Sequence, residues 1–313
     1  MPQRLEKKTF VVTDEDSLRL DKYCATQGMQ RSLFGSDGTT ITVNGKKGKK
    51  SQLVEKGDTI VVSYVASYFD GVKSEDIPLS VLYEDEEILV IDKEQGMVVH
   101  PASGNWDGTL VNALLGRYGD DFLDEDDSSL RPGIVHRLDK DTSGTMVIAR
   151  SREAQENLIA QFKAHTTEKV YIAVAKGVFK DAAGTIETGM ERSRSDRKKF
   201  CVCPPDSGKL AHTEYRVLRQ FPDCALLRVH ILTGRTHQIR VHLSSIGHPV
   251  IGDPIYGNGK DGSTLLLHAL CLSFDHPGSG VRMTFRAPLP SRFLSFLTPR
   301  LARRNALARS SGA

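Results

Sequence analysis

Residues 133–150 read GIVHRLDKDTSGTMVIAR, a charged turn between two short apolar stretches. Short apolar runs bounded by turn residues are typical of buried strands, so we expect a strand on each side of the turn. The turn presents an aspartate, Asp139, followed by hydroxyl side chains. A carboxylate held in this way is suited to act as a nucleophile or a base.

The segments after this turn predict the fold class. Residues 151–165 have apolar side chains at helical spacing after Ser151, which we expect to cap a helix, and residues 236–247 predict a second helix with Thr236 as its cap. Residues 168–177, 212–221 and 224–232 read as strands. Because these strands follow one another without long intervening helices, we expect an α+β fold with a mixed, mainly antiparallel sheet.

The chain divides into four predicted parts. Residues 1–66 form a small head with one helix and short strands, residues 67–78 a linker, residues 79–300 a large body, and residues 301–313 a basic tail that is a candidate for disorder. In the head, four lysines cluster near residue 48 and could bind phosphates, although a solvated turn is the common alternative.

Composition and charge narrow the class of protein. The 313 residues carry a net charge of +3, but residues 131–313 hold 28 basic against 15 acidic side chains, and this excess favours a polyanionic partner. Five scattered cysteines without a CxxC pair argue against a zinc ribbon or a disulfide framework. The polar first residues and the lack of an apolar run of ~20 residues predict a cytoplasmic protein without membrane contact.

Other motif interpretations of the chain fail on spacing. Asp141 begins DTSG rather than the D[ST]G of an aspartic protease, and His237 and His242 lie too far apart for HExxH. The GxGxxG at residues 257–262 lies in a polar loop, so it is not a dinucleotide site. The acidic run at residues 120–129 lacks the pattern of a calcium loop, and we predict no metal.

Five stretches in order, HRLDKDTSG, KVYIAVAKG, GRTHQIRVHL, GHPVIGDPIYG and LLLHALCLSF, resemble the RluA family of pseudouridine synthases. The resemblance runs from about Val81 to the end of the body. Residues 17–64 resemble the ribosomal-protein-S-four-type, or alpha-L, RNA-binding domain that the RluC and RluD branches carry. One departure is Glu94 after Lys93, where the family usually has proline.

The resemblance implies isomerisation of uridine to pseudouridine within an RNA chain, without a cofactor. Asp139 would be the essential carboxylate, Arg235 the arginine that pairs with it, and Tyr171 the aromatic side chain that stacks on the target base. Each has an ordinary structural alternative: a turn cap, a surface arginine and a core tyrosine. Arg137 would contact RNA at the flipped nucleotide, with a salt bridge to Asp141 as its alternative.

Further substrate-binding and RNA-binding positions follow from the same resemblance and from the basic clusters. The other expected substrate-binding residues are His136, Thr142, Lys169 and Ile239, the last equally well explained by core burial. The expected RNA-binding residues are Arg19, Lys22, Lys46, Lys47, Lys49, Lys50, Arg197 and Lys198. The expected partner is ribosomal RNA of the large (23S) subunit, within the subunit or its assembly intermediates, bound by a monomer. Transfer RNA, or RNA binding without catalysis, remain alternatives.

Overall fold

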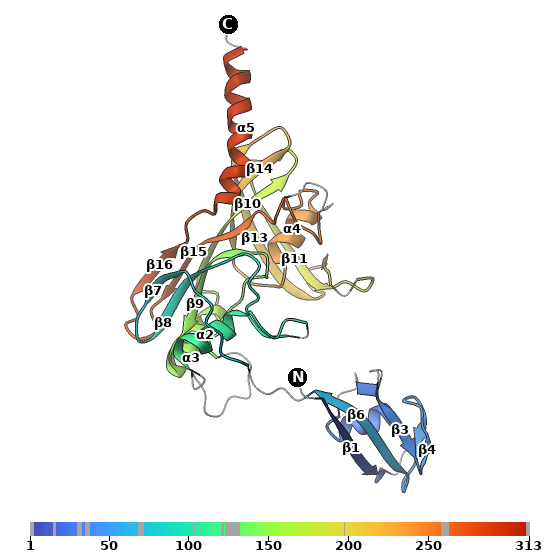
Figure 1. The fold of residues 1–313 in the computed structure, drawn as a ribbon. Coiled ribbons are helices and arrows are strands. Elements are labelled where there is room, and N and C mark those ends of the chain that lie inside the picture. The colour runs from blue at the N-terminus through green and yellow to red at the C-terminus, as the bar shows by residue number, and fades with distance from the viewer. Residues whose placement is uncertain are drawn as a thin grey trace. The chain divides into compact units, whose positions relative to one another are not determined.

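The computed structural model describes residues 3–14, 17–29, 33–34, 38–67, 72–102, 104–119, 122, 132–196, 198–257 and 263–310. The chain separates into two compact units, residues 1–71 and 72–313, shown in Figure 1. The predicted linker, residues 67–78, spans this division.

The small unit is a sheet with a helix packed on it. Its elements are β1 (Gln3–Val11), β2 (Leu18–Arg19), α1 (Leu20–Thr26), β3 (Thr40–Val43), β4 (Lys46–Lys47), β5 (Leu53–Val54) and β6 (Thr59–Ser67). One sheet has the order β1-β6-β3-β4, and β2 pairs with β5. Leu20, Tyr23 and Cys24 of α1 are buried against the sheet, because their spacing puts them on one helix face. Most of residues 30–37 lie outside the described part of the chain.

The large unit is built on one sheet of ten strands. Its elements are β7 (Val81–Glu84), β8 (Ile88–Lys93), α2 (Leu110–Tyr118), β9 (Ser143–Ala149), α3 (Arg152–Lys163), β10 (Glu168–Lys176), β11 (Ala183–Arg192), β12 (Phe200–Cys203), β13 (Lys209–Gln220), β14 (Cys224–Ile231), α4 (Gln238–Ser245), β15 (Leu267–Asp275), β16 (Arg282–Arg286) and α5 (Ser291–Ser310). The strand order is β12-β11-β13-β14-β10-β15-β9-β8-β7, with β16 beside β15. Among these described strands only β15 and β9 pair in parallel, so the predicted mainly antiparallel sheet is confirmed.

Helices cover both faces of this sheet. Leu89 and Met146 pack toward α2, whereas their neighbours Val90 and Val147 pack toward α3. This alternation arises because successive side chains of a strand point to opposite faces. In the other half of the sheet, α4 covers the same face as α2, since Tyr171 packs against both of their clusters, and α5 covers the opposite face. The pocket described in the next subsection lies on this face of the sheet, beside α4.

Two predicted helix boundaries can be compared with the structure. Ser151 caps α3 as predicted, its Oγ accepting a hydrogen bond from the N–H of Ala154 at 3.1 Å. The predicted cap Thr236 is wrong, because α4 begins one residue later, with His237 in the cap position.

Residues 301–310, expected to belong to a tail without regular structure, continue α5, which Figure 1 shows running on beyond the sheet. Among the described residues, no helix has the length and apolar character that a membrane crossing requires.

Candidate active site

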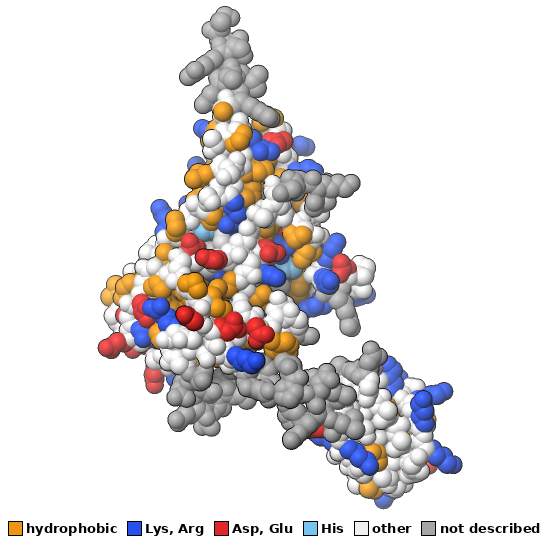
Figure 2. Space-filling view, viewed as in Figure 1, with side chains coloured by type: hydrophobic (Ala, Val, Ile, Leu, Met, Phe, Trp, Pro, Cys, Tyr) orange, Lys and Arg blue, Asp and Glu red, His pale blue; other side chains and the backbone are white. Residues whose placement is uncertain are grey.

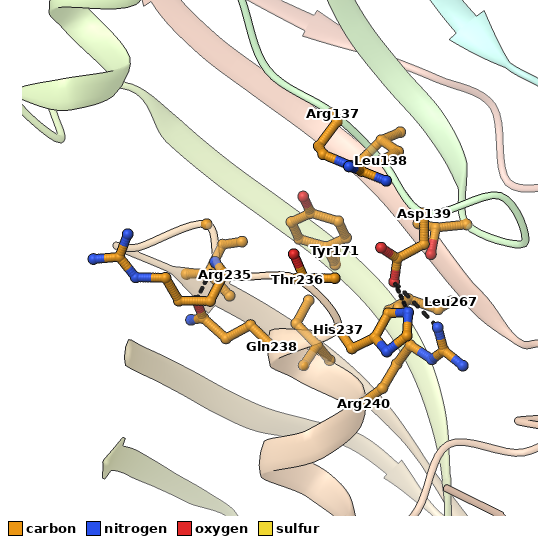
Figure 3. Close-up of a pocket in the computed structure, with 14 residues that line it drawn as sticks. Arg137, Leu138, Asp139, Tyr171, Arg235, Thr236, His237, Gln238, Arg240 and Leu267 are labelled. Atoms are coloured by element: carbon orange, nitrogen blue, oxygen red, sulfur yellow. Dashed lines mark hydrogen bonds and ion pairs between the residues drawn. The ribbon is translucent and has the colours of Figure 1, made fainter. Parts of the chain in front are cut away.

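A pocket opens on the sheet face between α2 and α4, beside the charged turn (Figure 3). It is lined by Arg137, Leu138, Asp139, Thr142, Tyr171, Ile231, Gly234, Arg235, Thr236, His237, Gln238, Ile239, Arg240 and Leu267. These residues come from four separate parts of the chain: the charged turn, β10, the stretch from the end of β14 through the following loop into α4, and β15. The pocket therefore exists only once the sheet has formed.

The backbone of the turn that carries Asp139 accepts hydrogen bonds from Lys93 and Gly96. Lys93 is fully buried, and its Nζ donates to the carbonyl oxygens of Glu94, Met97 and Lys140 at 2.8, 2.9 and 3.3 Å. The N–H of Gly96 also donates to the Lys140 carbonyl, at 2.8 Å. Burial lowers the pKa of Lys93 to about 8, although the nearby carboxylates of the turn oppose this shift. The backbone after Asp139 is thus fixed, with Glu94 in place of the family's usual proline.

Asp139 is paired with Arg240. Nη1 of Arg240 donates to Oδ2 of Asp139 at 3.2 Å, while Nε and Nη2 bind both oxygens of Asp253 at 2.7 and 2.8 Å. Burial by itself would lower the pKa of Arg240, but the two carboxylates outweigh it and raise that pKa above its ordinary value. Asp253 in turn accepts the backbone N–H groups of Ile255 and Tyr256. The arginine is therefore a fixed cation between two carboxylates.

The predicted pairing of Arg235 with Asp139 is wrong. Nε of Arg235 donates to the carbonyl oxygen of Leu210 at 2.9 Å, and Figure 3 shows its guanidinium pointing away from Asp139. The physical reason is its position: Arg235 lies in the loop before α4, whereas Arg240 lies inside the first turn of the helix, facing the pocket. Both arginines belong to the stretch GRTHQIR, so the motif alone did not distinguish them.

His237 is a pocket residue that the sequence analysis did not assign. It adopts a left-handed backbone conformation, with φ 58° and ψ 16°, at the start of α4. Its Nε2 lies 3.9 Å from Oδ2 of Asp139, and its Nδ1 lies 2.8 Å from the hydroxyl of Tyr256. Burial lowers the pKa of His237, so the neutral ring is favoured. The strained backbone was the signal that only the structure could give.

The remaining pocket residues include four predicted ones. Tyr171 faces the pocket from β10 at an irregularity in the pairing of β10 with β15, and burial raises its pKa. Arg137 is exposed and, among the described residues, has no ion-pair partner, Asp141 included. Ile239 lines the pocket and also belongs to the core under α4, so both of its expected roles describe its position. The Thr142 hydroxyl is buried at the pocket without a hydrogen-bond partner among the described residues.

Two other predicted substrate-binding residues lie outside the pocket lining. Nε2 of His136 accepts the N–H of Val147 at 3.0 Å, and its ring stacks on Phe162 of α3, so this side chain packs away from the pocket. Burial lowers the pKa of His136 to about 3. Nζ of Lys169 donates to the carbonyl oxygen of Leu232 at 2.9 Å, which anchors the loop that leads to α4. Both side chains therefore stabilise the backbone around the pocket without lining it.

The predicted RNA-binding residues are mostly exposed. The side chains open to solvent are those of Lys22, Lys46, Lys47, Lys49, Lys50 and Lys198. Arg19 is also exposed but forms an ion pair with Asp21 at 3.0 Å, and Arg197 lies outside the described residues. Figure 2 shows Lys and Arg side chains on the visible face of the small unit.

In the described ranges, no group of three or more His, Cys, Asp or Glu side chains is arranged to hold a metal ion. The acidic run at residues 120–129 falls outside those ranges except for Phe122.

Comparisons with known proteins agree with this geometry. Residues 87–245 match the family described as RNA pseudouridylate synthase. The chain is 42% identical to the ribosomal large subunit pseudouridine synthase D of Pseudomonas aeruginosa, over 95% of this chain and 97% of that protein. A protein of the same name from Borreliella burgdorferi is 39% identical over 93% and 92%. The solved structure of human RNA pseudouridylate synthase domain containing 1 is similar with a TM-score of 0.55 and 26% identity, covering 69% of this chain and 87% of that one. The chain belongs to the RNA pseudouridylate synthase family, as its resemblance to the RluA branch predicted.

Proposed function

We propose that this protein isomerises uridines to pseudouridine in large-subunit ribosomal RNA. The observation that carries the proposal is Asp139, a carboxylate at the mouth of a pocket with a buried arginine on one of its oxygens. The names of the relatives from Pseudomonas aeruginosa and Borreliella burgdorferi support the ribosomal substrate. Transfer RNA, and RNA binding without catalysis, are outcomes that the experiment below separates from it.

The reaction breaks the bond between N1 of uracil and C1′ of ribose and forms a bond between C5 and C1′. A proton leaves C5 and one is gained at N1, so atoms balance without a cofactor. Oδ2 of Asp139 faces Arg240, and Oδ1 has no hydrogen bond to any described residue. We assign Oδ1 as the oxygen that acts on the nucleotide, as nucleophile or as base.

The other pocket residues have roles in binding the extruded nucleotide. The ring of Tyr171 offers a face on which a flipped uracil can stack, and Ile239 an apolar wall. Arg137, exposed beside the turn, is placed to enter the space that the base leaves in the RNA. Arg235 has its outer guanidinium nitrogens available for a phosphate, a role different from the one its motif suggested.

The small unit is proposed to bind RNA through Lys46, Lys47, Lys49 and Lys50. Their exposure, together with the resemblance of residues 17–64 to the alpha-L type, supports this role. A separate basic unit increases affinity for structured RNA because two linked contacts act together. Catalysis itself is assigned to the large unit.

The test is carbodiimide primer-extension mapping of pseudouridine on 23S ribosomal RNA incubated with the protein. New stops that disappear with Asp139→Asn are expected. Asp141→Asn is the matched control, because it removes a carboxylate from the same turn that does not line the pocket. Stops that survive Asp139→Asn would overturn the assignment of the carboxylate. Stops on transfer RNA alone would show that transfer RNA, not ribosomal RNA, is the substrate. RNA binding without any stops would show that the protein binds RNA without catalysing the reaction.

A further inference from the structure

His237 joins the catalytic carboxylate to a chain of hydrogen bonds that the reaction described above does not use. The hydroxyl of Tyr256 lies 2.8 Å from Nδ1 of His237. The same hydroxyl oxygen accepts the backbone N–H of Phe200 at 2.9 Å. On the other side of the ring, Nε2 lies 3.9 Å from Oδ2 of Asp139. Three separate segments, β12, the loop after α4 and the start of α4, therefore meet at this one imidazole.

The hydrogen bonds of the Tyr256 hydroxyl favour one tautomer of the ring. Since the oxygen of Tyr256 already accepts from Phe200, its own proton is free to be donated to Nδ1 of His237. A neutral imidazole that accepts at Nδ1 carries its hydrogen on Nε2. That N–H lies on the side of the ring that faces Asp139, as the dashed line in Figure 3 shows.

The ring is held firmly in this orientation. Its edge contacts with Phe200 and Tyr256 are nearly perpendicular, at 79° and 80° between ring planes. The left-handed backbone of His237 is strained, because it is a conformation that residues other than glycine rarely adopt. A strained residue beside a catalytic group persists where its surroundings hold it in a conformation that serves the function.

We propose that His237 is a positioning residue for the isomerisation: its Nε2–H, oriented by Tyr256 and Phe200, supports Oδ2 of Asp139 together with Arg240 and leaves Oδ1 to the nucleotide. The 3.9 Å separation is longer than a hydrogen bond. Catalytic hydrogen bonds of this kind are often long in the free enzyme and shorten when substrate binds. The inference rests on the proposed function for its kinetic part only.

The charges around the ring are consistent with a neutral donor. Asp139 and Asp253 favour the protonated ring, whereas burial, Arg240 and Arg137 disfavour it, and the net effect lowers the pKa of His237. Burial raises the pKa of Tyr256, which keeps its phenol protonated and able to donate.

Two substitutions distinguish positioning from simple packing. In His237→Asn the amide reaches about as far as Nδ1, so it can still meet Tyr256 but no longer reaches Asp139. In His237→Gln the amide reaches about as far as Nε2, so the interaction with Asp139 can be kept. If His237 positions Asp139, the single-turnover rate on 23S RNA should fall about 10- to 100-fold in His237→Asn, which is the effect of losing a hydrogen bond to a charged group. In His237→Gln the rate should be partly restored. The affinity for RNA should be unchanged in both variants.

The matched control is His165, a second histidine with a left-handed backbone, φ 57°, at the end of α3 and outside the pocket. The unfolding temperatures of His165→Asn and His165→Gln show how much stability is lost when a histidine with a left-handed backbone is replaced. Tyr256→Phe removes the hydroxyl that orients the ring, and its effect on the rate should not add to that of His237→Asn if the two act as one unit.

A tautomer measurement keeps the proposal testable even if ribosomal RNA is not the substrate. Long-range proton–nitrogen NMR of the whole protein should show the hydrogen of His237 on Nε2, and the Tyr256→Phe variant should show a mixture of tautomers. A hydrogen on Nδ1 in the unaltered protein, or His237→Asn turning over at the normal rate, would overturn the proposal. A correct tautomer with no pseudouridine formed by the unaltered protein would instead count against the proposed function.

Discussion

Arg240 binds two carboxylates at once, and this sharing explains why an arginine is needed beside the turn that carries Asp139. Its planar fork gives Nε and Nη2 to Asp253 and keeps Nη1 for Asp139. A lysine is a single point charge and cannot meet both partners with this geometry. Asp253 is itself tied to the backbone of Ile255 and Tyr256, so the arginine cannot follow Asp139 if that side chain moves.

We expect Arg240→Lys to lower the single-turnover rate on 23S RNA at least about 100-fold and to destabilise the fold by a few kcal/mol, because Asp253 is left buried with a poorer partner. Arg235→Lys is the comparison, since it changes the other arginine of the same motif. We expect it mainly to weaken RNA binding. Rapid-quench kinetics and urea unfolding measure the two effects, and equal losses of rate in both variants would contradict the pairing described above.

Gly144 shows why the turn ends in glycine. It has φ 121°, and a Cβ there would lie 2.2 Å from the backbone oxygen of Ala269 in β15. Gly144→Ala must therefore separate β9 from β15, and we expect it to cost more than about 3 kcal/mol of unfolding free energy. Gly280→Ala, at a positive φ with open space around it, should cost only about 1 kcal/mol. Chemical denaturation of both variants checks this, and similar losses would show that backbone conformation alone sets the cost.

At the scale of elements, the sequence predicts best where burial is complete on a strand or on one helix face. Of the two strands expected beside the charged turn, β9 is confirmed and the earlier one is wrong, because residues 133–135 contribute only an isolated bridge between Ile134 and Ile148. The face of α3 was predicted from Ala154, Leu158 and Phe162. The start of α4 was missed because His237 adopts a conformation that periodicity does not reveal. The wrong arginine has another cause, because Arg235 precedes the helix and Arg240 lies inside it with either cap, and the motif alone does not show which of the two faces the pocket.

Helix caps offer a test at this scale. Ser151 caps α3 at a partly exposed position, whereas Thr109 caps α2 where it is fully buried and joined to Asn112 in a reciprocal pair of hydrogen bonds. We expect Ser151→Ala to cost about 1 kcal/mol and Thr109→Ala about 2 kcal/mol, because the buried N–H and amide groups lose their partner without access to water. Denaturant midpoints measure both, and the reverse order would argue against burial as the cause.

For the whole molecule, stability should fall in mild acid. Burial lowers the pKa of His136 to about 3 and those of His242 and His268 to about 4, from about 6.5 in the unfolded chain. Below pH 6.5 the unfolded chain therefore binds protons that the folded chain does not. Each of these histidines should lower the unfolding free energy by about 1.4 kcal/mol per pH unit as the pH falls from 6.5 toward 4, while stability above 6.5 is unaffected by them.

Urea unfolding at pH 8, 6.5, 5.5 and 5 checks the slope. His242→Gln should reduce the slope of unfolding free energy against pH by about 1.4 kcal/mol per pH unit, because one of the three histidines with a lowered pKa is gone. His165→Gln is the control, since that histidine lies outside the core and should leave the slope unchanged. A slope that is the same in His242→Gln as in the unaltered protein would place the acid sensitivity elsewhere.

The two-unit organisation predicts a division between affinity and rate. Replacing Lys46, Lys47, Lys49 and Lys50 by glutamine should weaken RNA binding and reduce the dependence of log K on log salt by roughly 0.7 to 0.9 for each phosphate that is no longer neutralised. The rate at saturating protein should remain, since these side chains lie in the small unit and the pocket is formed by the large one. Filter binding over a salt series measures the first effect and single-turnover kinetics the second. A reduced rate with unchanged salt dependence would refute this division.

The parallel pairing of β9 with β15 has a consequence for the moment at which the enzyme becomes active during its own synthesis. Ser143 and Gly144, just after the charged turn, are registered against His268 and Ala269, more than 120 residues later in the chain. Arg292 of α5 then donates hydrogen bonds to the Leu267 carbonyl and the Ser143 hydroxyl. A nascent chain that has already displayed Asp139 must therefore wait until β15 and Arg292 have been synthesised before its pocket closes. Because residues inside the ribosomal tunnel cannot pack against the sheet, activity should begin only after Arg292 has left the tunnel.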